Sequence, residues 1–335
     1  MKKVLSIFLM LFMVFIISSC GKKGSDNLIK ELGKKVEDVE MYEVDAIMDV
    51  KEMNKSHIFD INIKYLKPDF YKVTLKNRDS NNIQIVLKNK EGVYVLTPAL
   101  NKSFKFQSDW PLNSSQPYLF QSLVKDILND KDAIVVKQND HFEIKTKVNY
   151  RRSSELITQK IIIDGKTLFP KEVIVLDGNN QEKITVSFNE VKYKCNFNKD
   201  EFKLEYSMNS AINTFKNILP TFNERCFLFP TMIGKGTELK QETTVDTANG
   251  KRVIMTFAGT SSFTVVEEYI NPDEELGASK IIYGDPVIIC TGIAFQTENT
   301  LTWHENGIEF FLISEDMTPD EMYVVANSFF VNTSK

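Results

Sequence analysis

Cysteine and histidine, which serve as nucleophiles, general bases and metal ligands, are scarce in this chain of 335 residues, which contains four cysteines and three histidines. His57, His141 and His304 begin or end expected strands, so we interpret them as strand-edge residues and predict no metal site. The adjacent Glu267 and Glu268 fall near a strand end, where solvated charge is the simplest interpretation. The sequence has no G-x-S-x-G, H-E-x-x-H or phosphate-loop motif. It therefore predicts a protein that is not an enzyme and uses no cofactor.

Cys20 is the cysteine whose surroundings suggest a definite chemistry. Lys2 and Lys3 are followed by the segment Val4–Ile17, which is apolar except at Ser6. A membrane-spanning helix needs roughly 20 apolar residues, and this segment is shorter. A positive start, a short apolar run and small residues before a cleavage point are typical of a secretion signal.

The residues Ile17-Ser18-Ser19-Cys20 resemble the bacterial lipobox, in which an aliphatic and two small residues precede a cysteine. The resemblance implies that the Cys20 sulfur receives a diacylglycerol and that residues 1–19 are removed. Two or three acyl chains would then hold the protein on a membrane, because each buried methylene contributes about 0.8 kcal/mol. An uncleaved anchor and a plain secretion signal with a chance cysteine are the alternatives. We expect an extracytoplasmic protein that is lipid-anchored to the cell membrane.

Composition limits the classes of partner. The formal net charge is −4 and no basic stripe is present, so nucleic acid is not an expected ligand. Cys195, Cys226 and Cys290 are too far apart for a C-x-x-C zinc site, and either one disulfide or three free thiols fits them. A hydrophobic fraction of 42% and this length favour two domains with real cores. We expect residues 20–26 to form a polar tether before the first domain.

Hydrophobic periodicity predicts mostly strands after one leading helix. Residues 27–39 have apolar side chains at helical spacing. The period then changes to two, which predicts antiparallel strands with one buried face. A proline-containing loop and a second amphipathic helix at residues 119–128 interrupt the strands, which resume as far as residue 194.

A long antiparallel sheet with one apolar face must curl or be covered. We therefore predict a strongly curved half-barrel of ten or eleven strands, with the two helices over its concave side. An apolar cleft between the sheet and the helices fits this pattern, and so does a fully packed core.

Residues 27–205 resemble the LolA-like lipoprotein-carrier fold in the order of their parts: leading helix, strand meander, proline loop with helix, and long closing strands that end in NFNKDEFKL. The length, lipobox and two-part layout resemble sporulation and germination lipoproteins of the YdcC and GerS type of spore-forming Firmicutes. The concave face of LolA-like proteins holds acyl chains. The resemblance thus implies that Trp110, Phe120, Leu123 and Ile127 line a cleft for an acyl-chain ligand.

Residues 206–335 are expected to form a smaller α+β domain, which completes a mainly β, α+β protein. The segment Thr318-Pro319-Asp320-Glu321 is a capping box with proline at the first helical position, and it predicts a final helix. In the first domain, Arg151 and Arg152 join two strands in a polar loop. We expect these two arginines to contact a lipid headgroup or an acidic partner.

The resemblance implies a membrane-anchored, non-enzymatic binding or regulatory module of the sporulation or germination envelope. The partner that it implies is a spore cortex N-acetylmuramoyl-L-alanine amidase. A lipid or lipoprotein carrier that uses the apolar cleft is one alternative. An envelope-stress sensor is another, because a curved LolA-like domain followed by a smaller domain resembles the regulator RseB in architecture.

Overall fold

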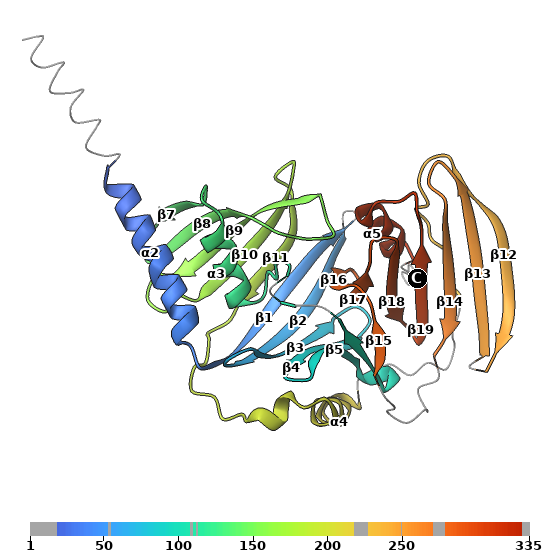
Figure 1. Cartoon of the computed structure of the whole chain (residues 1–335), viewed down its shortest axis with the longest axis horizontal. Helices are drawn as coiled ribbons and strands as arrows, with labels where there is room; N and C mark the ends of the chain where they lie inside the picture. Colours follow the sequence, from blue (N-terminus) through green and yellow to red (C-terminus); the bar gives the residue numbers. More distant parts are fainter. Residues whose placement is uncertain are drawn as a thin grey trace, which may run out of the picture.

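The computed structural model describes residues 19–52, 55–107, 110–111, 113–217, 227–248, 250–270 and 279–329. Two mostly antiparallel sheets stand next to each other, and helices pack against both (Figure 1). This mainly β architecture, with a second sheet in the C-terminal part, confirms the predicted fold class.

The first sheet contains the eleven described strands between Met41 and Phe188. Their bounds are β1 (Met41–Glu52), β2 (Lys55–Leu66), β3 (Phe70–Asn77), β4 (Ile83–Asn89), β5 (Gly92–Thr97), β6 (Lys102–Phe106), β7 (Ile134–Lys137), β8 (His141–Lys147), β9 (Leu156–Asp164), β10 (Pro170–Asp177) and β11 (Glu182–Phe188). Short β15 (Lys280–Ile282) adds a parallel strand beside β6, so the order is β15-β6-β5-β4-β3-β2-β1-β11-β10-β9-β8-β7. Buried and more exposed residues alternate along β1 and β2 as predicted. The register of each strand therefore places its apolar side chains on the core face of the sheet.

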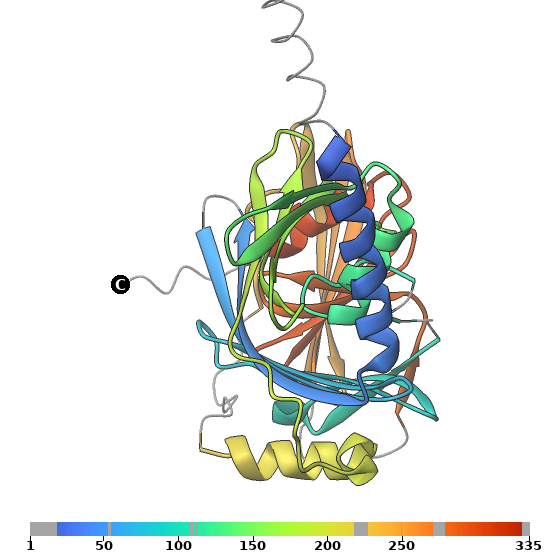
Figure 2. The ribbon, with the colours of Figure 1, turned by 90° about the vertical axis from the view of Figure 1, so that its left-hand side faces the viewer.

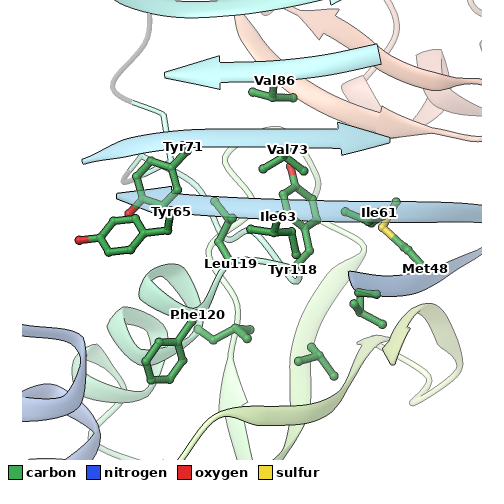
Figure 3. Close-up of a cluster of buried hydrophobic side chains, with 14 of the residues drawn as sticks. Met48, Ile61, Ile63, Tyr65, Tyr71, Val73, Val86, Tyr118, Leu119 and Phe120 are labelled. Carbon is green, nitrogen blue, oxygen red and sulfur yellow. The ribbon is translucent and has the colours of Figure 1, made fainter. Parts of the chain in front are cut away.

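Two helices cover the concave side of this sheet (Figure 2). They are α2 (Ser19–Asp38) and α3 (Phe120–Asn129), and both contribute side chains to the main core. Figure 3 shows part of that core, in which Tyr118 and Leu119 point toward Ile63 of β2. Because α2 begins at Ser19, it includes the residues that we expected to form a tether.

A further helix lies against the other side of the sheet. The single turns η1 (Pro98–Leu100) and η2 (Lys199–Phe202) and the helix α4 (Leu204–Phe215) pack near β3, β4 and β5. Met208 and Ala211 of α4 join a small separate core there. The sequence analysis missed α4, although its apolar residues recur at helical spacing. The boundary between domains at residue 205 stays a prediction.

The second sheet has the order β12-β13-β14-β19-β18-β17-β16. Its strands are β12 (Thr237–Thr247), β13 (Gly250–Gly259), β14 (Phe263–Tyr269), β16 (Asp285–Ile289), β17 (Gly292–Gln296), β18 (Thr300–Glu305) and β19 (Ile308–Ile313). The last helix, α5 (Pro319–Asn327), packs on this sheet, and Phe329 just beyond it contacts Trp303 and Phe310. The predicted capping box is confirmed, because the Thr318 side chain accepts a hydrogen bond from the Glu321 amide.

Side chains of the first sheet hold the second sheet in place. Gln84 of β4 binds the backbone of Ile293 twice: its Oε1 accepts from the amide at 2.6 Å, and its Nε2 donates to the carbonyl at 3.3 Å. Asn77 of β3 donates to the Cys290 carbonyl at 3.0 Å. The rings of Phe104 and Phe295 lie 5.5 Å apart across the same junction. These contacts fix the relative position of the two sheets.

Candidate ligand site at the junction of the two sheets

A cavity of about 120 Å³, here called the junction cavity, lies where the two sheets meet. The N-terminal part supplies the ends of β1 and β11, the proline loop at residues 114–118 and the loop of residues 150–156. The C-terminal part supplies β16, Ile293 of β17 and the helix α5. The apolar lining residues are Val50, Pro117, Leu156, Ile184, Pro286, Val287, Ile288, Ile289, Ile293 and Val324, with the rings of Tyr118, Tyr150 and Tyr323. The cavity is therefore an apolar site that needs both sheets.

Arg151 and Arg152 lie at the edge of the junction cavity. Arg151 Nη1 is 3.8 Å from Asp285 Oδ1, and Arg152 Nε is 3.3 Å from Asp285 Oδ2. Asn113 also donates to Asp285 Oδ1, at 2.6 Å. The structure thus gives the two predicted contact arginines a partner within the chain. Their contact with a headgroup or another protein stays a prediction.

The loop that carries these arginines is also fixed to α5. The amide and the hydroxyl of Ser154 both donate to Asp320 Oδ2 at 2.8 Å. Tyr323 Oη donates to the Arg152 carbonyl at 3.3 Å. One side of the junction cavity is therefore a hydrogen-bonded bridge between the first sheet and α5.

A buried polar network adjoins the cavity, and Ser115 and Tyr150 belong to the cavity lining. Asp126 Oδ2 accepts from Ser115 Oγ and from Gln159 Nε2, each at 2.8 Å. Burial raises the pKa of Asp126 to about 6, although these hydrogen bonds act in the opposite direction. Tyr150 Oη is buried beside this network and has no hydrogen-bond partner among the described residues. The network holds the proline loop between the junction cavity and a separate hollow lined mainly by polar residues such as Lys125.

The residues predicted to line a cleft lie inside the main core instead of at this cavity. Trp110, Phe120, Leu123 and Ile127 are each at most 1% exposed and belong to one packed cluster. None of them lines the junction cavity. Their side chains fill the space between the sheet and the helices. Whether a cleft opens there for a ligand stays a prediction.

The lipid-anchor motif is largely outside the structure. Ile17 and Ser18 fall outside the described residues, and only the backbone of Ser19 and Cys20 is described, as the start of α2. No described helix combines the length and the apolar character that crossing a membrane requires. The lipid anchor therefore stays a prediction.

The other candidate metal and redox residues can be placed only in part. Cys195 and Cys290 are free thiols, whereas Cys226 lies outside the described residues. Within the described part of the chain, no three His, Cys, Asp or Glu side chains are grouped as metal ligands. His304 lies near the end of β18, as the sequence indicates, but it is buried at the junction and stacks on Phe104 with 4.5 Å between ring centroids.

Glu267 is a second residue whose surroundings differ from the interpretation of the sequence. The side chain is fully buried, so the assignment of solvated charge is wrong. One carboxyl oxygen accepts from the Leu228 amide at 3.0 Å, and the other has no hydrogen-bond partner among the described residues. Burial raises the pKa of Glu267 to about 8. The alternation along β14 contained the signal, because Phe263, Val265 and Glu267 share one face.

We expect Glu267→Gln to remove part of the pH dependence of stability. The folded-state pKa of about 8 lies above the ordinary glutamate value, so the folded chain binds the extra proton between these two pH values. The wild-type free energy of unfolding should therefore fall as pH rises toward 8, by up to about 1.4 kcal/mol per pH unit from this group. Urea unfolding at pH 5, 7 and 9 measures this. A difference between variant and wild type that stays constant over that range would contradict the assignment.

Comparison with known proteins places the chain among sporulation proteins. A family model described as Sporulation protein YdcC-like matches residues 1–202. Sporulation protein YdcC of Bacillus subtilis (strain 168) is 34% identical over 342 residues, and the match covers 100% of both chains.

Solved structures show looser similarities. The Pseudomonas aeruginosa MucA/MucB complex includes a chain with 12% identity and a TM-score of 0.34, covering 90% of this chain and 98% of that one. A LolA superfamily protein from Nitrosomonas europaea has 7% identity and a TM-score of 0.31, and the match covers 53% of this chain and 98% of that one. A chain in the complex of the CwlD amidase with the GerS lipoprotein from Clostridioides difficile has 16% identity and a TM-score of 0.23. The match covers 52% of this chain and 95% of that one. Scores this low transfer no ligand or partner.

Proposed function

This chain belongs to the sporulation protein YdcC-like family, and we propose that it is a non-enzymatic binding or regulatory module of the sporulation envelope. In this proposal, a lipid on Cys20 holds the module on the outer side of the cell membrane. The junction cavity is the observation that carries the proposal, because it combines an apolar interior with charged groups at its edge. Such a concave, mostly apolar site is the usual form of a ligand-binding site.

The charged groups at the junction support binding rather than turnover. Asp285 is held by Arg152 and Asn113, and Asp320 is held by both donors of Ser154. A catalytic acid or base needs a free position within hydrogen-bond reach of its substrate. These carboxylates instead connect the two sheets, so their geometry favours a structural role around a binding site.

The predicted protein partner is a cortex N-acetylmuramoyl-L-alanine amidase. The side chain of Arg151 is 51% exposed at the edge of the junction and offers a cationic contact to such a partner. We expect the membrane-anchored chain to retain the amidase of its own host in affinity purification. Arg151→Ala should reduce the retained amount about five- to tenfold, which corresponds to about 1–1.4 kcal/mol.

Lys145→Ala is the matched control, because Lys145 is an exposed cation on β8 that does not line the junction cavity. It should leave retention unchanged. Failure of the wild-type chain to retain any amidase would contradict this partner. Equal retention by the two variants would instead place the contact away from the junction.

The two alternative functions differ in what supports them. A lipid or lipoprotein carrier needs an opening between the first sheet and α3, and Phe120 and Leu123 fill that space. An envelope-stress sensor fits the junction cavity better, because a ligand there would contact both sheets. The binding or regulatory module therefore remains the function that the geometry supports best.

A further inference from the structure

The junction cavity lies where the cores of the two sheets approach each other. Ile288 of β16 packs against the first core, and the preceding Val287 packs against the second. Their side chains point to opposite faces of β16, as successive strand residues do. Both residues also line the cavity. A ligand in this cavity would therefore touch side chains that belong to both cores.

The volume of the cavity limits the size of its ligand. An apolar cavity of about 150 Å³ accommodates benzene, which has six heavy atoms, so about 120 Å³ accommodates roughly five. Aliphatic and aromatic side chains form most of the walls, and such walls offer water few hydrogen bonds. A short unbranched alkyl group with roughly five heavy atoms therefore matches both the size and the character of the site.

The charged residues at the edge of the junction cavity limit the charge that the ligand headgroup can carry. The acidic residues there are Glu52, Glu155, Asp285 and Asp320, and the basic residues are Lys51, Arg151, Arg152 and Lys183. Because the acidic and basic residues balance, a multiply charged anion gains little binding free energy from this edge. A single negative charge can instead form an ion pair with one of the basic residues. The headgroup best suited to the edge therefore carries one charge.

Arg151 is the cation with the most unused hydrogen-bonding capacity. Lys51 is paired with Glu182 at 2.7 Å, and Arg152 is paired with Asp285 at 3.3 Å. Lys183 Nζ lies 3.8 Å from Asp177 Oδ2, and its ammonium group has only three donors. The ion-pair contact of Arg151 is 3.8 Å long, which is beyond hydrogen-bond range. A guanidinium group has five donors in a planar fork that matches a carboxylate. Arg151 can thus bind a carboxylate without releasing the Arg152–Asp285 pair.

We propose that the junction cavity binds a monocarboxylate amphiphile, with a single alkyl chain of about five carbons in the apolar interior and the carboxylate on Arg151. The proposal rests on the proposed binding function and names the class of ligand for that site. A ligand bound there would bridge the two sheets and stabilise the junction, so its presence would regulate the module.

Isothermal titration calorimetry with hexanoate, which has five alkyl carbons, tests the proposal. The chain of residues 21–335 is suitable, because the buried hydrophobic side chains of the described cores begin at Leu28. Hexanoate should bind at one site, and hexanol should bind at least tenfold more weakly. Arg151→Gln should weaken hexanoate binding to the level of hexanol and leave hexanol binding unchanged. Arg78→Gln, which alters another exposed arginine paired with an aspartate, should change neither.

A variant that fills the cavity provides the second arm. Val287→Phe should abolish binding of both probes while near-ultraviolet circular dichroism confirms a folded protein. Equal affinity of the wild type for hexanoate and hexanol would overturn the role of Arg151. Unchanged hexanoate binding by folded Val287→Phe would overturn the location. Amidase retention is measured without hexanoate, so failure of this proposal can be distinguished from failure of the proposed function.

Discussion

Replacing Gly292 by alanine is expected to lower the free energy of unfolding by about 3–5 kcal/mol. Gly292 has a φ of +145°, which side chains rarely adopt, and a Cβ at this position would lie 2.2 Å from Gln84 Oε1. Gln84 must then move, and its two hydrogen bonds to Ile293 would be lost or weakened. The substitution therefore acts on the contact that fixes the junction of the two sheets.

Urea unfolding of residues 21–335 measures this effect. Gln84→Ala removes the obstructing atom, so the double variant should be less destabilised than the sum of the two single variants. Gly178→Ala is the control, because its Cβ would meet only Ile157 at 3.8 Å. It should change stability by no more than about 0.5 kcal/mol. Strict additivity of Gly292→Ala and Gln84→Ala would contradict the proposed origin of the strain.

Phe120→Ala should destabilise the chain by about 3–5 kcal/mol, because truncating a buried phenylalanine leaves a cavity. Phe120 is 0% exposed, and its ring lies 5.0 Å from that of Phe169. A side chain that lined an open cleft would contribute far less to stability. This substitution therefore distinguishes a packed concave face from the cleft that a carrier would need.

Leu128→Ala is the matched control, since Leu128 lies on the same helix but is 51% exposed. It should cost less than about 1 kcal/mol in the same urea unfolding experiment. Similar, small losses for Phe120→Ala and Leu128→Ala would show that the concave face is not closely packed. That result would favour the carrier over the binding module.

The architecture of the first sheet could be predicted because burial follows the sequence pattern closely. From Tyr42 to Val50, every second residue of β1 is buried, as its period-two hydrophobicity indicates. The same reasoning identified α3 and the capping box at Thr318. These features depend on local periodicity and on hydrogen bonds between residues close in sequence. A single segment of the sequence is therefore enough to predict each of them.

Other local signals were present but were misinterpreted or missed. Glu267 lies on the buried face of β14 by simple alternation, yet its charge suggested solvent. The apolar spacing of α4, from Leu204 to Phe215, is helical and was missed. The chemical type of a single residue misled the interpretation only at Glu267.

Tertiary structure alone decided where the candidate site lies. Arg152 and Asp285 are 133 residues apart, and Gln84 and Ile293 are 209 apart. The sequence determined that each sheet has an apolar face, that the polar loop carries two arginines, and that a lipobox-like motif precedes the fold. Periodicity specifies which face of an element is buried, but not which distant surface buries it. The junction cavity exists only because strand ends of the first sheet pack against β16 and β17 of the second, and that choice depends on the shape and hydrogen bonding of both surfaces together.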